Sequence, residues 1–290
     1  MNDRRQQTDD AMDSKSQECS MWIDNDFKIF ELYERGNQNS RLDVQNCLEQ
    51  YSDKFKWPAR NARVLEVGSG EGSVTEVLFK WIPSDGELIG SDINEKIVQY
   101  ANLKHSNERM KFIQFDLVGE VPNDMKGQFD HVFAFYVLHW IRDHEKAFSN
   151  IYEILPKQGE FFAIFLARSD IYSIFQILSK RSKWAQWMEK IDKFSSMYHD
   201  YQDPDIDVSN NLKKVGFEVL DVRCKQRLFV HDIDVFKGLM AGINCFDIPK
   251  HMWAEFVDDI MEVKRYMDLV DESNHTVKTN YNLIVLHCRK

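Results

Sequence analysis

Residues 63–72, Arg63-Val64-Leu65-Glu66-Val67-Gly68-Ser69-Gly70-Glu71-Gly72, join a short apolar strand to a glycine-rich turn. The apolar periodicity that follows predicts an amphipathic helix from Ser73 to Trp81. Glycines between a strand and a helix allow a tight turn and bring the backbone close to a ligand. The stretch therefore predicts the first unit of a parallel α/β sheet, with a ligand beside its carboxyl edge.

Strands and helices keep alternating along the chain, which predicts a parallel sheet with helices on both faces. Two more strands and a helical stretch broken at Pro249 are expected in the C-terminal third. The expected strands are 87–91, 111–115, 131–135, 160–166, 217–230 and 280–288, and the expected helices are 95–103, 145–155, 205–215 and most of 232–272.

The rest of the chain divides into an arm, two leading helices and a cap. Residues 1–20 are polar without apolar periodicity, so a disordered arm is expected there. The single domain then spans 21–290, with two helices in 21–57 that break near Gly36. An aromatic-rich helical cap is expected at about 169–215.

Composition narrows the class of protein. The net charge of −10 and the pI of about 5.4 disfavour nucleic acid and anionic membranes as partners. No run approaches the roughly 20 apolar residues that span a bilayer, and no secretory signal is evident. Five cysteines without a Cys-x-x-Cys pair predict free thiols, no metal site and a cytoplasmic protein.

Carboxylates follow the first three strands of the expected sheet. Glu66 would repel a pyrophosphate but suits the ammonium of a methionine group, and Ser73 stands where a dinucleotide fingerprint has Gly or Ala. Asp92 is placed to accept hydrogen bonds from two ribose hydroxyls, and Asp116 to meet an adenine amino group. Taken singly, Gly68 and the two aspartates could serve only a turn or helix caps.

The fourth strand ends in an aromatic segment, Phe135 to Trp140, at the same sheet edge. Ligands of open α/β sheets lie outside the carboxyl ends of the strands. Together these features predict an S-adenosylmethionine site, held by Glu66, Gly68, Gly70, Asp92, Ile93, Asp116, Leu117 and Phe135.

This order of motifs resembles the class I methyltransferases, which implies a Rossmann-like sheet of seven strands with the last antiparallel. A closer resemblance covers nearly all of residues 30–290 and points to the insect juvenile hormone acid O-methyltransferases. It is carried by Leu32-Tyr33, Cys47-Leu48-Glu49, Gly72-Ser73-Val74-Thr75, Phe129-Asp130-His131-Val132-Phe133, Tyr136-Val137-Leu138-His139-Trp140-Ile141-Arg142-Asp143, Ala147-Phe148-Ser149-Asn150-Ile151, Trp184, Trp187, His199-Asp200, Asp203-Pro204 and Phe246-Asp247-Ile248-Pro249.

The resemblance implies methylation of the carboxylate of a juvenile hormone acid or farnesoic acid. In that family a Gln of a Gln-Lys-Arg-Asp segment clamps the carboxylate together with the Trp of a His-Trp pair. Here the matching stretch is Ser40-Arg41-Leu42-Asp43, so Trp140 is kept and Ser40 replaces the Gln. The expected catalytic residues are Trp140 with Ser40, or with Gln38 if the helix is shifted.

Carboxylate methylation places few demands on the protein. A carboxylic acid with a pKa near ~4–5 is already ionised at neutral pH, so no general base is needed. Neutral donors such as the Trp140 indole N–H can orient the oxygen. His139 is therefore expected to pack or hydrogen-bond, with general-base action as the alternative.

An apolar pocket for an isoprenoid chain is expected at the aromatic run 172–201, which could equally form the core of the cap. The expected substrate contacts are Tyr136, His139, Tyr172 and Trp184. Two other functions stay open: methylation of a different small acid, amine or hydroxyl, and ligand binding by a methyltransferase fold without turnover.

Overall fold

The computed structural model describes residues 27–243 and 245–290. The expected arm at 1–20 and the first residues of the leading helices lie outside the described residues. No helix in the described part of the chain is long and apolar enough to cross a membrane.

A mixed β-sheet with the order β3-β2-β1-β4-β5-β8-β6 forms the centre of the molecule. The first five strands are parallel, and β8 runs antiparallel between β5 and β6. The prediction of seven strands with an antiparallel last strand is confirmed; a two-residue strand, β7, is added beside β8. The bounds are β1 Arg63–Val67, β2 Glu87–Asp92, β3 Met110–Gln114, β4 His131–Phe135, β5 Glu160–Ser169, β6 Glu218–Asp232, β7 Val270–Asp271 and β8 Thr276–Arg289.

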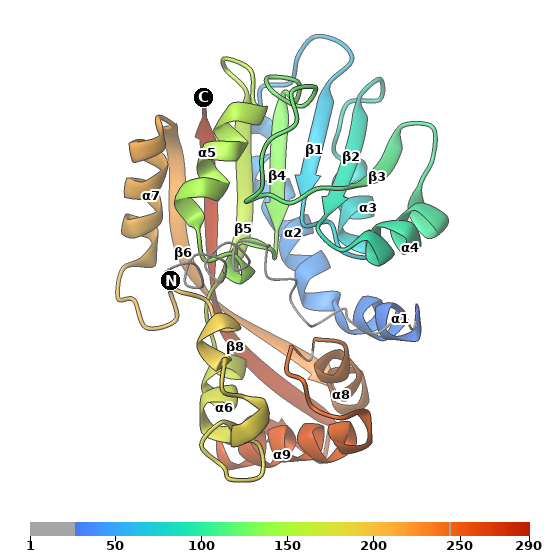
Figure 1. Ribbon diagram of the computed structural model, residues 1–290, viewed down its shortest axis with the longest axis vertical. Coiled ribbons are helices and arrows are strands. Elements are labelled where there is room, and N and C mark those ends of the chain that lie inside the picture. Colours follow the sequence, from blue (N-terminus) through green and yellow to red (C-terminus); the bar gives the residue numbers. More distant parts are fainter. Residues whose placement is uncertain (1–26, 244) are drawn as a thin grey trace, which may run out of the picture.

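Helices cover both faces of the sheet, as the alternation predicts (Figure 1). One face buries the apolar sides of α2 (Gln38–Tyr51), α3 (Ser73–Phe79) and α4 (Glu95–His105). The other face buries those of α5 (His144–Ile154) and α7 (Pro204–Val215). Local chemistry starts these helices: the Asn94 side chain caps α4, and the Asp143 side chain caps α5.

The cap lies beyond the carboxyl ends of the parallel strands (Figure 1). It holds α6 (Asp170–Leu178), α8 (Ile233–Gly242) and α9 (Trp253–Tyr266), whose buried apolar residues form one core. Strands β6 and β8 are 15 and 14 residues long and continue past the sheet as a paired ribbon that leads into the cap.

The cap therefore differs from the expected insertion at about 169–215. After α6 the chain forms only short 3₁₀ turns at Ala185–Trp187 and Ile191–Lys193. Helix α7 turns its apolar stripe, Val208 and Leu212, into the sheet-face core beside α5. The cap instead takes α8 and α9, because the extended ribbon delivers them to the same end of the sheet.

Helix α1 (Phe27–Gly36) bridges the sheet domain and the cap. Its Phe30 ring meets Tyr100 of α4 edge-on, with 5.4 Å between centroids. On the other side Gly36 lies so close to α8 that a Cβ there would sit 2.5 Å from Leu239 Cβ. Helix α1 thus crosses the sheet edge at which a ligand is expected.

Candidate cofactor and methyl-acceptor site

The glycine-rich turn after β1 lies against the loops after β2 and β4. Gly68 has a φ of +71°, and a Cβ there would sit 2.3 Å from Val137 Cγ2, so only glycine fits. The Gly70 amide donates to Asp92 Oδ2 over 3.1 Å, and the Asn94 amide donates to Asp92 Oδ1 over 3.0 Å. The carboxylate expected to meet a ribose thus also shapes the turn.

Glu66 is fully buried at the end of β1, and neither of its oxygens makes a hydrogen bond of normal geometry within the described residues. The Ser69 hydroxyl is also buried without a partner in that part of the chain. The Thr75 hydroxyl lies close enough to Glu66 to lower its pKa, but burial, helped by the Glu71 and Asp92 charges, outweighs this contact and raises the pKa of Glu66 to about 8. Unpaired buried polar atoms are rare, so this group points to a polar ligand that completes it.

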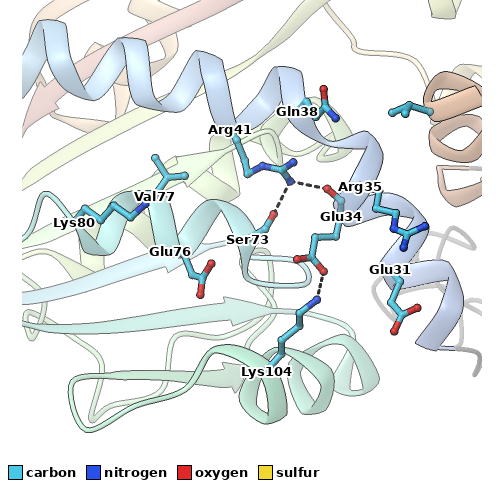
Figure 2. A pocket seen from close by; sticks show the side chains of 11 residues that line it. Glu31, Glu34, Arg35, Gln38, Arg41, Ser73, Glu76, Val77, Lys80 and Lys104 are labelled. Carbon is cyan, nitrogen blue, oxygen red and sulfur yellow. Dashed lines mark hydrogen bonds and ion pairs between the residues drawn. The ribbon is translucent and has the colours of Figure 1, made fainter. Parts of the chain in front are cut away.

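Glu71 and Arg41 belong to the same region, although the sequence motifs did not single them out. Glu71 is buried in the glycine turn and accepts a hydrogen bond from the Ser73 hydroxyl. Arg41 Nη1 donates to Ser73 Oγ over 3.3 Å and to the Glu34 carbonyl over 2.6 Å. Figure 2 shows Arg41 on the wall of a polar cavity of about 770 Å³ between α1, α2, α3 and α4.

The charge of this region selects the ligand. Glu66, Glu71 and Asp92 all have pKa values raised by burial, which means that each carboxylate lacks sufficient compensation. A cationic group would relieve them, whereas a pyrophosphate would add repulsion. The positively charged sulfonium and ammonium groups of S-adenosylmethionine therefore fit these three carboxylates, and the negatively charged pyrophosphate of a dinucleotide does not.

The loops after β2 and β3 are held by side-chain amides. Gln114 Nε2 donates to the Ile93 carbonyl over 2.9 Å. Asn150 Nδ2 donates to the carbonyls of Leu117 and Gly119, each over 2.7 Å. The Asp116 carboxylate accepts from the Val118 amide over 3.0 Å, so it caps its own turn as well as facing the sheet edge.

The loop after β4 carries the expected methyl-acceptor residues. Phe135 is buried among other rings, and Tyr136 has a φ of +55°, which is uncommon outside glycine. His144 Nε2 lies 2.9 Å from the Leu138 carbonyl and must donate, so its Nδ1 accepts from Tyr198 Oη over 3.0 Å. These bonds fix the 3₁₀ turn Leu138–Trp140.

His139 is buried beside Trp140, with 5.0 Å between ring centroids. Burial, followed by the influence of His144, lowers the pKa of His139 to about 3. Its Nδ1 has no partner among residues 27–243 and 245–290. A histidine with so low a pKa is a weak base, so this environment favours packing or hydrogen bonding over proton abstraction.

The two candidates for the second arm of the clamp lie in different surroundings. Ser40 is 3% exposed on the inner side of α2, whereas Gln38 is exposed and lines the polar cavity (Figure 2). Which of the two meets a substrate together with Trp140 stays a prediction.

The two expected contacts in the cap differ as well. Trp184 is fully enclosed in the cap core, and its indole N–H donates to Asp259 Oδ2 over 2.6 Å, which supports a packing role. Tyr172 meets His199 edge-on at 5.5 Å and keeps an unpartnered hydroxyl within the described chain. Tyr172 thus keeps a donor that a bound molecule can use.

Comparisons with known proteins show the family of this chain. A family model described as "Methyltransferase domain" matches residues 65–163. The juvenile hormone acid O-methyltransferase of Bombyx mori is 40% identical over 268 residues, which are 90% of this chain and 96% of that protein. The Drosophila melanogaster protein of the same name is 32% identical, over 89% of this chain and 91% of that protein.

Solved structures share the fold at low sequence identity. A putative methyltransferase from Bacillus halodurans has a TM-score of 0.56 at 16% identity, over 84% of this chain and 98% of that one. Phosphoethanolamine N-methyltransferase 2 of Haemonchus contortus, solved with S-adenosylhomocysteine, has a TM-score of 0.56 at 15% identity, over 93% of this chain and 59% of that one. The expected Rossmann-like class I methyltransferase fold is confirmed.

Proposed function

The chain belongs to the family of juvenile hormone acid O-methyltransferases, and from this premise we propose that it converts a lipophilic isoprenoid acid to its methyl ester with S-adenosylmethionine. The observation that carries the proposal is the environment of Trp140. The loop after β4 presents a neutral indole donor beside His139, whose pKa of about 3 makes it a poor base. That combination suits an acceptor that is already ionised.

The cofactor supplies an activated methyl group on its sulfonium. Glu66 would hold the methionine ammonium, Asp92 the ribose hydroxyls and Asp116 the adenine amino group, with Gly68 and Gly70 allowing close approach. Ile93, Leu117 and Phe135 would line the adenosine site. Arg41, beside Glu71 and Ser73, adds a cation suited to the methionine carboxylate.

Catalysis then rests on orientation. Trp140 and Ser40 donate hydrogen bonds to the substrate carboxylate and aim one oxygen at the methyl carbon. Neutral donors orient the oxygen without drawing off as much of its charge as a lysine or arginine would. Tyr136 and His139 flank this position, and Tyr172 lies farther toward the cap, where the apolar chain would run.

A second candidate function is methylation of a different small acid, amine or hydroxyl. Ser40, at the position where the family has Gln, favours this alternative. We also propose a cytoplasmic location, as the composition predicts; none of the four cysteines in the described residues forms a disulfide.

An acid panel tests the function. The methylation rate of the purified full-length chain should rise from short dicarboxylates to farnesoic-type and juvenile-hormone-type acids. The reason is that moving an apolar chain from water into an apolar pocket lowers the free energy. Ester formation from labelled S-adenosylmethionine measures the rates. A preference for the polar acids would overturn the assignment of the apolar pocket.

Glu66 predicts proton release on cofactor binding. With a pKa of about 8 it is mostly protonated at pH 7, and an arriving ammonium group favours the carboxylate form. S-adenosylmethionine should therefore release close to one proton at pH 7, where its own α-ammonium is still mostly protonated (pKa about 7.7–8.0). Calorimetry in buffers of different ionisation enthalpy measures this release. Equal release by Glu66→Gln would remove Glu66 from the ammonium site.

Ser40→Gln tests the clamp. A longer neutral donor should orient the carboxylate better and raise kcat/KM on juvenile-hormone-type acids about 2- to 12-fold, the equivalent of roughly 0.5–1.5 kcal/mol. Trp140→Phe should lower the rate in both backgrounds, and a double-mutant cycle would show coupling. A neutral Ser40→Gln together with a harmful Gln38→Ala would instead place the second donor at Gln38.

A further inference from the structure

The Asp43 carboxylate is the most heavily hydrogen-bonded side chain near the clamp. It is 2% exposed on α2. Its Oδ2 accepts from Tyr136 Oη over 2.7 Å and from Tyr281 Oη over 2.6 Å, and its Oδ1 accepts from Arg227 Nε and Nη2 over 3.0 and 2.5 Å. Four donors fill the acceptor sites of one carboxylate, so Asp43 has none left for a substrate proton.

These donors come from three strands at one place in the sheet. Tyr136 directly follows β4, while Arg227 on β6 pairs in register with Tyr281 on β8. Tyr281 also pairs with Ser169, the last residue of β5, where the ribbon leaves the sheet for the cap. Asp43 therefore joins α2 to the base of the cap and to the loop after β4, residues 136–140, which we call the acceptor loop.

The bond to Tyr136 supports an unfavourable backbone. A non-glycine residue at a φ of +55° is strained and persists only where its surroundings hold it. The turn at Tyr136 sets Val137 against Gly68, and the Trp140 amide then donates to the Val137 carbonyl over 2.9 Å. Burial and the Asp43 charge raise the pKa of Tyr136, so its hydroxyl remains a donor.

Helix geometry places Asp43 beside the other arm of the clamp. Residues three apart on a helix lie on the same face, and Ser40 and Asp43 are both buried there. The Asp43–Tyr136 hydrogen bond ties α2, which carries Ser40, to the loop after β4, which carries Trp140. It therefore limits how far these two elements can move apart.

We propose that Asp43 is a positioning residue that acts through Tyr136 to hold Trp140 and Ser40 at the spacing needed to orient the acceptor carboxylate. The proposal rests on the proposed function for the identity of that acceptor. Arg227 and Tyr281 fix the rotamer of Asp43. The Tyr281 hydroxyl also hydrogen-bonds with the Tyr136 hydroxyl, but its removal leaves the Asp43–Tyr136 bond in place.

A matched pair of variants tests this. Tyr136→Phe and Tyr281→Phe each delete one hydroxyl from the same carboxylate oxygen, at nearly equal distance. Each loses a similar amount of stability. Tyr136→Phe should also lower kcat on the acid about 2- to 12-fold with an unchanged Kd for S-adenosylmethionine, whereas Tyr281→Phe should keep kcat within about a factor of two.

A spectroscopic readout makes the test independent of the substrate. In protein labelled with 5-fluorotryptophan, Trp140→Phe assigns the ¹⁹F resonance of Trp140. That resonance should shift or broaden in Tyr136→Phe and stay in place in Tyr281→Phe. Equal effects of the two variants on kcat and on the resonance, or no effect of either, would overturn the role of Asp43. A wild type that methylates no acid would contradict the proposed function, while the resonance comparison would still decide the positioning role.

Discussion

Asp92→Ala is expected to weaken the binding of S-adenosylmethionine by about 2–4 kcal/mol, roughly 30- to 1000-fold in Kd. We propose that Asp92, the last residue of β2, accepts hydrogen bonds from two ribose hydroxyls, and charge-assisted hydrogen bonds at buried sites are among the stronger ones. The same carboxylate accepts the Gly70 amide, so its loss also loosens the glycine turn. Titration calorimetry on the full-length chain measures the change.

Asn94→Ala is the control for local structure around Asp92. It removes the side-chain cap of α4 but keeps the Asn94 backbone amide that donates to Asp92. Cofactor affinity should then stay within a few-fold of wild type. Unchanged affinity in a folded Asp92→Ala protein would remove Asp92 from the cofactor site.

Asp43→Ala is expected to lower the free energy of unfolding by about 2–3 kcal/mol. The substitution removes the common acceptor of the Arg227 guanidinium and of the Tyr136 and Tyr281 hydroxyls. The Tyr281 hydroxyl is buried and loses its acceptor there, whereas the Arg227 side chain is 35% exposed, so water can solvate its charge and limits the loss. Chemical denaturation followed by circular dichroism measures the loss.

Asp53→Ala is the matched control, because Asp53 is exposed on the 3₁₀ turn after α2. Its substitution should change the free energy of unfolding by less than about 0.5 kcal/mol. A loss below about 1 kcal/mol for Asp43→Ala would show that Arg227 and the tyrosines find other partners. Such a result would also weaken the positioning role of Asp43.

The sequence leaves open that the chain binds its ligand without turnover. Cofactor titration and the substrate panel together test this alternative. A protein that binds S-adenosylmethionine through Asp92 and methylates no acid, amine or hydroxyl acceptor would be a binding protein. Membership of a family of O-methyltransferases argues for turnover.

The sequence alone determined the layers of the sheet, and the strand order came from the structure. Alternating short apolar runs and amphipathic stretches predict a parallel sheet with helices on both faces. Strand β4 begins and ends at the predicted residues, His131 and Phe135. The glycine turn and the carboxylates at strand ends were also readable, because the carboxyl ends of parallel strands meet at one edge.

Only the tertiary structure decided which polar residues share a site. Asp43 meets Tyr136, Arg227 and Tyr281 across separations of 93, 184 and 238 residues, and local periodicity carries no information about such contacts. The same holds for the burial that shifts the pKa values of Glu66 and His139. The cap was misplaced for a related reason: α7 has the same amphipathic pattern as a cap helix, and the surface that buries its stripe is set by where β6 and β8 run. The spacing of apolar side chains predicts that one face of a helix is buried. Which surface that face packs against depends on the path of the whole chain.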